Sequence, residues 1–531
     1  MKTPREIFFF TSAVLIPLLI GLFFWVDWAW IPAVVVGPFY LLGWWDVIQK
    51  KHALLRIYPV LGHLRFLFES IRPEIQQYFV ESNINGRPVS REFRDLVYQR
   101  AKGDPDTRPF GTQFEVYRGG YQWVNHSLNP APRLDEEPRV IFGSETCSHP
   151  YAASHLNISA MSFGSLSRNP ILALNTGARR DGFAHNTGEG GVSPYHLQPG
   201  GDLIWQIGTG YFGCRTSDGK FDPDRFAATA RQDSIKMIEI KLSQGAKPGH
   251  GGILPAAKLT PEIAAIRGVP LGRDVLSPPS HSAFTTPVGL LQFVAELRRL
   301  SGGKPVGFKL CLGHRAEFFA ICKAMLETGL YPDFITVDGG EGGTGAAPIE
   351  FTNSVGTPLR DGLSFVRNAL RGIDYRSRIR LIASGKIISA FDIFRAKALG
   401  ADTVNSARAM MFALGCIQAR RCNSGNCPTG IATQDPARSQ ALDVDHKAGR
   451  VARYHRAMIR QFLDLVATAG LPSPDQIRPC HVNHRVHGAT VNTYEDMYPE
   501  VERGCLLRDA SVPPAWARDW DRSSPDHWAA A

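Results

Sequence analysis

The sequence predicts an α/β protein: a (β/α)8 TIM barrel with an N-terminal transmembrane helical hairpin and a C-terminal helical extension. Three observations predict this arrangement. Two long uncharged apolar runs stand at the N-terminus, eight short β-rich runs alternate with helical segments, and a long amphipathic run follows them. Strands that alternate with helices are typical of parallel βαβ units, and eight such units close into a barrel.

The first region, residues 1–48, is interpreted as a membrane hairpin. Its spans, 7–26 and 28–45, hold 20 and 18 uncharged residues on either side of Asp27. About 20 apolar residues cross a bilayer core as a helix, and one helix through both runs would overshoot it. Basic residues flank the hairpin, so the positive-inside rule predicts an inner (plasma) membrane anchor with the rest of the chain in the cytoplasm. A cleaved signal peptide is the alternative, but no small-residue cleavage site follows the first span.

Residues 49–150 are interpreted as a helical neck or linker. Apolar side chains recur there near helical spacing, among them Phe68, Ile71, Ile75 and Tyr78. Such a segment either rests on lipid headgroups or packs as a plain connector, and both alternatives stay open.

The barrel is predicted over residues 151–440. Its strands are expected at 156–164, 183–186, 237–243, 274–279, 306–312, 334–340, 380–385 and 403–408. In such a barrel the chemistry lies at the C-terminal ends of the strands. Residues 441–531 follow as a helical extension, with a helix expected over 444–469 and a loosely held tail in the last 20 or so residues.

The charge and the cysteine content of the chain limit the kinds of partner and cofactor that it binds. The formal net charge is +10, yet no basic run exceeds three residues, which excludes a dedicated nucleic-acid arm and suits an anionic membrane surface. Nine cysteines in a long chain favour reduced thiols and a bound metal over a disulfide scaffold.

Three cysteines stand close together in the run CIQARRCNSGNCPTGIATQ, residues 416–434. Cys416, Cys422 and Cys427 follow the spacing Cys-x5-Cys-x4-Cys, just beyond the last predicted strand. Soft thiolate ligands favour iron–sulfur or zinc, but the Cys-x2-Cys hook of many zinc sites is absent. Three ligands followed by Cys-Pro therefore favour a [3Fe–4S] cluster over [4Fe–4S]. Buried, unligated cysteines are the alternative.

This run closely resembles the iron–sulfur segment in the FMN-binding central region of glutamate synthases. Further matching runs, in the family's order, are MSFGSLS (161–167), NTGEGG (186–191), QGAKPGHGG (244–252), SPPSH (277–281) and DGGEGGTGAAP (338–348). The resemblance covers roughly residues 155–470 and implies FMN and a [3Fe–4S] cluster as cofactors.

The resemblance also implies a flavin site. Glycine-rich backbone after the last barrel strands suits a cofactor phosphate, which makes Ser384, Gly385, Lys386, Ala407 and Arg408 candidates. Lys309 is expected near the flavin ring, where a cation stabilises the reduced cofactor. The remaining expected flavin contacts are Met161, Ser162, Phe163, Gln244, Gly342 and Gly343.

Catalytic and substrate residues follow from the same resemblance. Glu189 corresponds to an acid beside the 2-oxoglutarate and flavin site, and Lys247 to a lysine that binds a substrate carboxylate. Together with Lys309 they are the expected catalytic residues. His250, Ile253 and His281 complete the expected substrate pocket.

Two positions in that pocket depart from the family. His250 replaces an acid and Ile253 replaces a glutamine that holds 2-oxoglutarate. A lost amide donor leaves a polar substrate group unpaired, at a cost of about 1–3 kcal/mol. The cofactor residues are expected to be intact and the substrate pocket altered.

Three functional hypotheses remain. The first is glutamate formation from 2-oxoglutarate and external ammonia, since no glutaminase domain is recognised. The second is the same chemistry on another amino or oxo acid, and the third is a non-catalytic electron-transfer module at the membrane. No GxGxxG fingerprint follows a strand, so electrons are expected from a reductase subunit, a ferredoxin or a membrane component.

Overall fold

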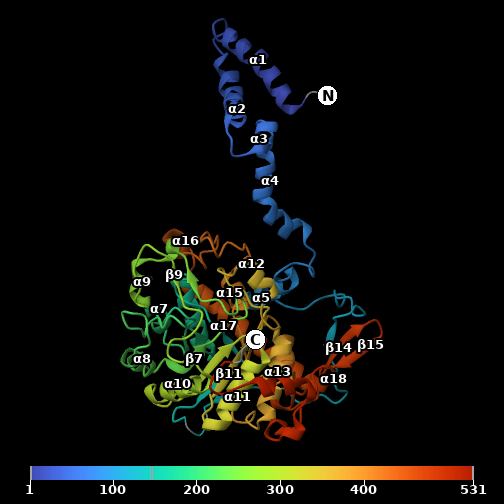
Figure 1. Ribbon diagram of the computed structural model, residues 1–531. Coiled ribbons are helices and arrows are strands. Elements are labelled where there is room, and N and C mark those ends of the chain that lie inside the picture. Colours follow the sequence, from blue (N-terminus) through green and yellow to red (C-terminus); the bar gives the residue numbers. More distant parts are fainter. Residues whose placement is uncertain (1–2, 144, 146, 529–531) are drawn as a thin grey trace. The chain divides into compact units, whose positions relative to one another are not determined.

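The computed structural model describes residues 3–143, 145 and 147–528. It contains two compact units, Met1–Arg91 and Glu92–Ala531, each described here by itself (Figure 1).

The first unit carries an antiparallel pair of long apolar helices, α1 (Pro4–Phe23) and α2 (Trp30–Ile48). Phe8 packs against Tyr40 and Trp44 with ring centroids 5.7 and 5.8 Å apart, which joins the start of α1 to the end of α2. Gly43 permits this approach, because a Cβ there would lie 2.3 Å from the Phe8 ring. Both helices are long and apolar enough to cross a membrane.

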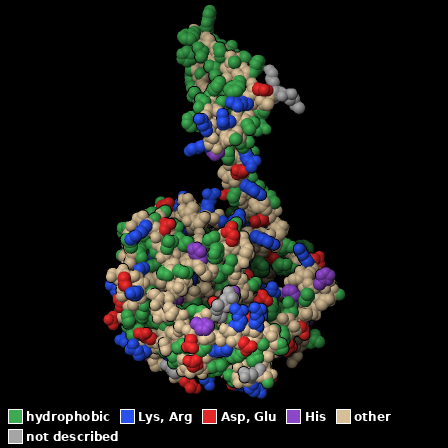
Figure 2. All heavy atoms as spheres, viewed as in Figure 1, with side chains coloured by type: hydrophobic (Ala, Val, Ile, Leu, Met, Phe, Trp, Pro, Cys, Tyr) green, Lys and Arg blue, Asp and Glu red, His purple; other side chains and the backbone are tan. Residues whose placement is uncertain are grey.

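Three further helical segments complete this unit: α3 (Ala53–Ile57), α4 (Gly62–Ile75) and the π-helical η1 (Gln76–Val80). Asp46 of α2 is fully buried; its carboxylate accepts from Val60 N at 2.9 Å and lies 2.9 Å from His63 Nε2. Figure 2 shows hydrophobic side chains over most of the visible surface of the hairpin, and basic side chains below it.

The second unit contains a closed barrel of eight parallel strands, which confirms the predicted fold class. In barrel order the strands are β10 (Val306–Leu310), β11 (Phe334–Asp338), β12 (Arg380–Ser384), β13 (Thr403–Ser406), β4 (Leu156–Ile158), β5 (His185–Asn186), β6 (Leu203–Ile207) and β7 (Ile235–Lys241).

One barrel strand was not predicted, and one predicted strand is not in the barrel. The strand β6 was not predicted, although Leu203–Ile207 is fully buried between β5 and β7. The run 274–279 is not a barrel strand. Its residues Val275–Leu276 form β9, which pairs antiparallel with β8 (Ile253–Leu254) outside the barrel. Pro278 and Pro279 prevent a longer strand, because proline cannot donate to a central ladder.

Helices follow the strands around the barrel, as expected of βαβ units. They are α6 (Arg168–Asp181), α7 (Pro194–Leu197), α8 (Pro223–Ala230), α10 (Pro287–Leu300), α11 (Arg315–Thr328), α12 (Ile349–Ser354), α13 (Leu359–Gly372), α14 (Ala390–Ala398) and α15 (Arg408–Leu414). A long insertion between β7 and α10 holds β8, η2 (Ala256–Lys258), α9 (Pro261–Arg267) and β9.

A small hairpin of β2 (Val140–Phe142) and β3 (Tyr151–Ala153) packs at the N-terminal ends of the barrel strands. Phe142 meets Phe334, the first residue of β11, edge to face at 5.7 Å. Ahead of it lie α5 (Arg91–Lys102) and β1 (Gln122–Val124), and residues 103–121 contain no helix or strand. β1 joins β14 (Val482–His487) and β15 (Thr490–Thr493) in an antiparallel sheet.

The C-terminal extension contains the expected long helix, α17 (Val444–Thr468), preceded by α16 (Pro436–Gln440). It packs along α6, where a Cβ on Gly177 would lie 2.8 Å from Val451. Short elements follow: η3 (Pro474–Gln476), η4 (Pro479–His481), α18 (Tyr494–Met497), η5 (Cys505–Leu507) and η6 (Asp509–Ser511).

The expectation of a loose tail is wrong over 514–522. This segment forms α19 (Pro514–Arg522), whose Trp516 and Trp520 are buried against Phe319 of α11, with ring centroids 5.4 Å away in both cases. Two buried indoles supply enough apolar area to fix a short helix.

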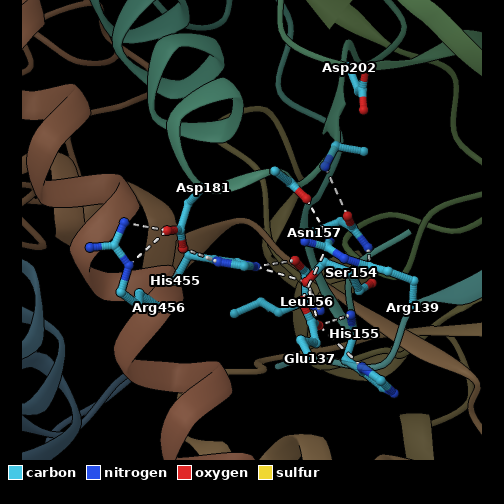
Figure 3. Close-up of polar contacts among 12 residues, drawn as sticks. Glu137, Arg139, Ser154, His155, Leu156, Asn157, Asp181, Asp202, His455 and Arg456 are labelled. Carbon is cyan, nitrogen blue, oxygen red and sulfur yellow. Dashed lines mark hydrogen bonds and ion pairs between the residues drawn. The ribbon is translucent and has the colours of Figure 1, made fainter. Parts of the chain in front are cut away.

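A buried polar network joins α17 to the barrel at the start of β4 (Figure 3). His455 lies 2.7 Å from Asp181 through Nδ1 and 2.9 Å from Ser154 Oγ through Nε2. Ser154 in turn donates to Glu137 at 2.7 Å. Burial would raise the pKa of Glu137, but the hydrogen bond with His155 and the charge of His455 hold that pKa at about 2. The carboxylate therefore stays charged.

Candidate active site at the barrel mouth

The loops at the C-terminal ends of the strands converge on one mouth. The predicted flavin and substrate residues lie on these loops, at strand ends, at the start of α15 or in the insertion after β7, and the three predicted cluster cysteines follow α15. Glycines let the loops approach closely: a Cβ on Gly245 would lie 1.8 Å from Gly339 O, and one on Gly190 would lie 2.9 Å from Ser162 Cβ. The loops after β7 and β11, and those after β4 and β5, therefore lie in direct contact.

Glu189 and Lys241 form a mostly buried ion pair, with Nζ 2.6 Å from Oε2. Lys241 ends β7, and Glu189 lies on the loop after β5. Burial would raise the pKa of Glu189, but Lys241, Arg267 and Lys247 outweigh burial and hold that pKa below its ordinary value. Glu189 is thus a carboxylate at neutral pH.

A small pocket opens beside this ion pair. Glycines lie directly against the Glu189 side chain. A Cβ on Gly252 would lie 2.4 Å from the Oε1 atom of Glu189. The pocket is lined by Glu189, Thr209, Lys241, Leu242, Ser243, Gly249, His250, Gly251, Gly252, Pro278 and Pro279. The structure therefore brings two predicted residues, Glu189 and His250, together with Lys241, which was not predicted. A lysine that ends a barrel strand was the available signal.

The other predicted substrate residues, Lys247, Ile253 and His281, are not part of this lining. Lys247 is buried and donates to Gly251 O at 2.7 Å. Burial lowers the pKa of Lys247, although the Glu189 carboxylate opposes that change. The His250 ring meets Phe351 edge to face at 5.4 Å, while Ile253 pairs with Leu276 in the β8–β9 ladder.

His281 has a positioning geometry. Its Nε2 lies 2.9 Å from Lys241 O and its Nδ1 lies 3.0 Å from the Tyr211 hydroxyl. Burial lowers the pKa of His281 to about 4, so the ring is neutral. A carbonyl only accepts, so Nε2 carries the proton and Tyr211 donates to Nδ1. His281 fixes the end of β7 from which Lys241 projects.

Lys309 lies beside Lys241 on the neighbouring strand β10, in register with it. Residues in register on parallel strands point to the same face, so both ammonium groups are directed toward the barrel mouth. Lys309 is buried, and its ammonium group makes no hydrogen bond or ion pair with another residue in the described part of the chain. A buried lysine without a protein partner suits an anionic or electron-rich ligand.

The predicted phosphate loops follow β12 and β13, which are adjacent in the barrel. Ser384 ends β12, followed by Gly385 and by Lys386 with φ of 50°, and Ala407 precedes α15. Arg408 lies against the loop after β11, since a Cβ on Gly343 would lie 1.9 Å from its Nη2. Gly342 N donates to Gly339 O at 3.0 Å, and Gln244 O accepts from Lys247 N at 3.3 Å.

Met161, Ser162 and Phe163 are buried on the loop after β4, the strand next to β13. Met161 N donates to Asn186 O at 3.2 Å. The predicted flavin residues thus follow the rim continuously from β7 through β10, β11, β12 and β13 to β4. Their glycines and main-chain groups suit the phosphate of FMN, and Lys309, which has no partner among the described residues, suits its electron-rich ring.

The three cysteines lie beyond α15 as free thiols, near enough to influence one another's ionisation. Burial and the thiols of Cys422 and Cys427 raise the pKa of Cys416 to about 11. The Gln418 N–H group and the Arg408 charge lower this pKa, but by less. Main-chain N–H groups, Ala432 first, overcome burial and lower the pKa of Cys427. Three cysteine thiols are the type of ligand that an iron–sulfur cluster requires. However, among the described residues no three Cys, His, Asp or Glu side chains converge as a ligand set.

Two basic residues at this site were not predicted. Lys258 of η2 is buried and donates to Cys422 O at 2.6 Å and to Ala432 O at 3.4 Å. Arg267 of α9 donates to Phe163 O at 3.3 Å and stacks over Phe212 at 5.0 Å. Both come from the long insertion after β7, and no local pattern in the sequence indicates which loops they meet.

Comparisons with known proteins identify the family. Residues 128–472 match the conserved region in glutamate synthase. The chain is 35% identical over 513 residues to the glutamate synthase large subunit-like protein YerD of Bacillus subtilis, covering 88% of this chain and 97% of that protein. It is 38% identical over 323 residues to the archaeal glutamate synthase (NADPH) of Methanocaldococcus jannaschii, covering 60% of each chain.

Among solved structures, a mutant flavocytochrome b2 with pyruvate bound aligns with a TM-score of 0.42 at 11% identity, covering 80% of this chain and 94% of that chain.

The chain belongs to the glutamate synthase family, as the resemblance of its motifs implies. It is an oxidoreductase of the class that acts on CH–NH2 groups.

Proposed function

We propose that this chain is a membrane-anchored enzyme that uses FMN and a [3Fe–4S] cluster to reduce the imine of a 2-oxo acid and ammonia to an amino acid. The observation that carries the proposal is the Glu189–Lys241 pair, set in a glycine-walled pocket at the barrel mouth beside Lys309. A chain that only relays electrons has no need of such a pair.

In the proposed reaction, ammonia adds to the carbonyl carbon and the oxygen leaves as water. Lys247 and Lys241 would hold the substrate carboxylate and polarise the carbonyl. Glu189, ionised at neutral pH, would take a proton from the added nitrogen, and Lys241 would return one to the departing oxygen. The 2.6 Å contact between the two groups allows that proton to be shared between them.

The flavin residues would be those along the rim: Met161–Phe163, Gln244, Lys309, Gly342–Gly343, Ser384–Lys386 and Ala407–Arg408. Hydride delivery to the imine carbon is the chemistry that FMN supplies when bound, and single electrons are what an iron–sulfur cluster supplies. Lys309 would supply a positive charge that stabilises the reduced flavin. Electrons would arrive from a partner reductase, a ferredoxin or a membrane component.

The second candidate substrate is a 2-oxo acid other than 2-oxoglutarate. His250, which stands where the family has an acid, lines the pocket and backs onto Phe351. The substrate therefore meets an imidazole at a position where the family has a carboxylate, which changes the polarity of the pocket wall. Ile253 lies outside the pocket lining, so His250 is the position to test first.

The test begins with anaerobic purification of the full chain and quantification of flavin and iron. The chemically reduced protein is then mixed with ammonium and either 2-oxoglutarate or a 2-oxo acid with an uncharged side chain, while flavin absorbance is followed. We expect reoxidation by one of them, slowed about 100-fold or more in Glu189→Gln. A colourless, iron-free protein would overturn the proposal. Reoxidation only by the acid with the uncharged side chain would establish the second substrate.

Membrane anchoring is tested separately by carbonate extraction of cell membranes. The full chain is expected in the pellet, and a variant lacking residues 3–48 in the supernatant. Release of the full chain by carbonate would contradict the anchor.

A further inference from the structure

The helix α4 carries an exposed apolar stripe that no part of its own unit covers. The α4 stripe consists of Leu61, Leu64, Phe68, Ile71 and Ile75, which are 59, 49, 60, 39 and 39% exposed. A contiguous apolar face of this size on a helix marks a surface that is covered by a partner.

The spacing of these residues points to one kind of partner. Successive members of the α4 stripe are separated by three, four, three and four positions, which is the a/d pattern of a coiled coil over two heptads. A helix lying flat on a bilayer needs a broad apolar face rather than a narrow seam. Within α4, Leu67 widens the stripe on one side, whereas Phe66 lies away from the stripe against His52; exposed Tyr78 and Phe79 follow only in η1.

The outward face of α4 suits the same arrangement. Arg65 and Glu69, one turn apart, form an ion pair of 2.9 Å within the helix, so the Arg65 charge beside the stripe is already matched. Pro73 falls on the face opposite the stripe, where its ring does not meet a facing helix. Coiled-coil seams are typically flanked by such charged positions.

The direction of α4 leads it away from the hairpin. Its first turn is tied to the end of α2, because His63 lies 2.9 Å from the buried Asp46 carboxylate. Within this unit α4 continues beyond the end of α2 instead of folding back along α1 or α2 (Figure 1). If α1 and α2 span the bilayer, α4 projects from its surface, where lipid does not reach the stripe.

We propose that the α4 stripe packs against the same stripe of a second copy of this chain, as a short parallel coiled coil. The inference rests on the proposed membrane anchor. Two heptads are marginal in free solution, but two chains inserted in one bilayer share an orientation and a high effective concentration. The membrane hairpin and the α4 stripe would thus act together to pair two enzymes.

Cysteine crosslinking in vesicles tests this proposal in a Cys480→Ser background. Residues 1–91 contain no native cysteine, and this background removes the exposed native thiol of the second unit. Single variants Leu64→Cys, Phe68→Cys and Ile71→Cys are compared with the outward-facing controls Glu69→Cys and Ser70→Cys, using a short bis-maleimide. In vesicles carrying several copies, we expect the stripe positions to give about tenfold more crosslinked dimer than the controls. Equal yields at all five positions would overturn the coiled coil.

Two further measurements test whether lipid or another part of the same chain covers the α4 stripe instead. In vesicles with at most one copy each, a fluorophore on Phe68→Cys should be solvent-exposed and not quenched by spin-labelled lipid. Quenching would assign the stripe to the bilayer, and protection without quenching would assign it to the same chain; either result overturns the proposal. Leu64→Glu combined with Phe68→Glu should reduce crosslinking at Ile71→Cys to the control level, while Ser70→Glu should leave it unchanged.

Carbonate extraction of the same vesicles distinguishes failure of the anchor from failure of the pairing. Chains that resist extraction yet crosslink without periodicity contradict only the coiled coil. Chains that are extracted contradict the anchor on which it rests.

Discussion

At the scale of single residues, the pocket depends on the charge balance between Glu189 and Lys241. Each is mostly buried, and Arg267 and Lys247 add positive charge around the carboxylate. Removing one member of such a pair leaves the other charge in a poorly solvated position, which costs more than the pair itself contributes. The ionisation of Glu189 is therefore coupled to stability as well as to chemistry.

We predict that Lys241→Met lowers the free energy of unfolding by about 1–3 kcal/mol at pH 7, measured by urea denaturation of the full chain in detergent. The double variant Lys241→Met, Glu189→Gln should recover most of this loss, because no buried charge remains. The pKa of Glu189 is lowered in the folded protein, so its contribution is complete above about pH 4.3 and is lost as pH falls through the folded pKa. A double variant less stable than Lys241→Met would refute this explanation.

Lys258 acts on the cysteine segment through main-chain carbonyls. We predict that Lys258→Met releases Cys422 O and Ala432 O and lowers the iron content of anaerobically purified protein several-fold, because each charge-assisted hydrogen bond contributes about 1.5–3 kcal/mol. Flavin content should not change. Lys236→Met is the control, because Lys236 lies near the N-terminal end of β7, opposite the strand ends that bear the site. An unchanged iron content in Lys258→Met would show that the cysteine segment keeps its conformation without Lys258.

The sequence motifs placed Glu189, His250 and Lys309 at one mouth, because glycine-rich runs and strand ends are local signals. They could not indicate Lys241, Lys258 or Arg267 as partners. These contacts join segments that are far apart in the chain, such as Lys258 and Cys422, and depend on how a long insertion folds over the barrel. Nor could the motifs show that His281 bonds to Lys241 O.

At the scale of elements, the contact between α6 and α17 ties the C-terminal extension to the barrel. Two ion-paired contacts cross it and differ in burial. Asp181 binds His455 at 2.7 Å and Arg456 at 2.6 Å in a largely buried position (Figure 3), whereas Asp445 pairs with Arg180 at the surface. The same helices therefore offer a buried contact and a matched exposed one.

We predict that Asp181→Ala lowers the free energy of unfolding by about 2–4 kcal/mol at pH 7, since His455 loses the acceptor of its Nδ1 proton in a buried position. The control Asp445→Ala should cost less than about 1 kcal/mol. Burial would raise the pKa of Asp181, but His455 and Arg456 lower it overall. The difference in the free energy of unfolding between Asp181→Ala and wild type is thus largest above about pH 3.9. It shrinks as the pH falls through the pKa of Asp181 in the folded protein. Equal effects of the two variants would contradict the role of burial.

The elements themselves were predictable where their periodicity was strong. The helix α17 and most barrel strands follow from their patterns, whereas β6 and the run 274–279 do not. An apolar run such as Leu203–Ile207 fits a buried strand or a buried helix equally, and a β-rich run bounded by prolines fits a loop hairpin as well as a strand. The helix α19 was missed because its stability comes from Trp516 and Trp520 packing on α11, a tertiary contact.

At the scale of the whole molecule, the chain combines a lipid-suited unit with a catalytic one. The hairpin exposes apolar side chains along nearly its whole length, which water disfavours and lipid accepts, and its basic flank lies at the end of α2. The enzyme would then act next to the membrane surface, in the same compartment as both ends of the hairpin.

We predict the topology that follows from this arrangement, using a membrane-impermeant maleimide and mass spectrometry of the labelled peptides. Cys480 is an exposed native thiol of the second unit, and Trp28 lies in the turn between α1 and α2. In inverted inner-membrane vesicles Cys480 should be labelled and Trp28→Cys should not, because the turn faces the vesicle interior. In spheroplasts the result should reverse. Labelling of Cys480 in intact spheroplasts would place the barrel outside the cell, against the positive-inside rule and away from any cytoplasmic source of ammonia and reducing equivalents.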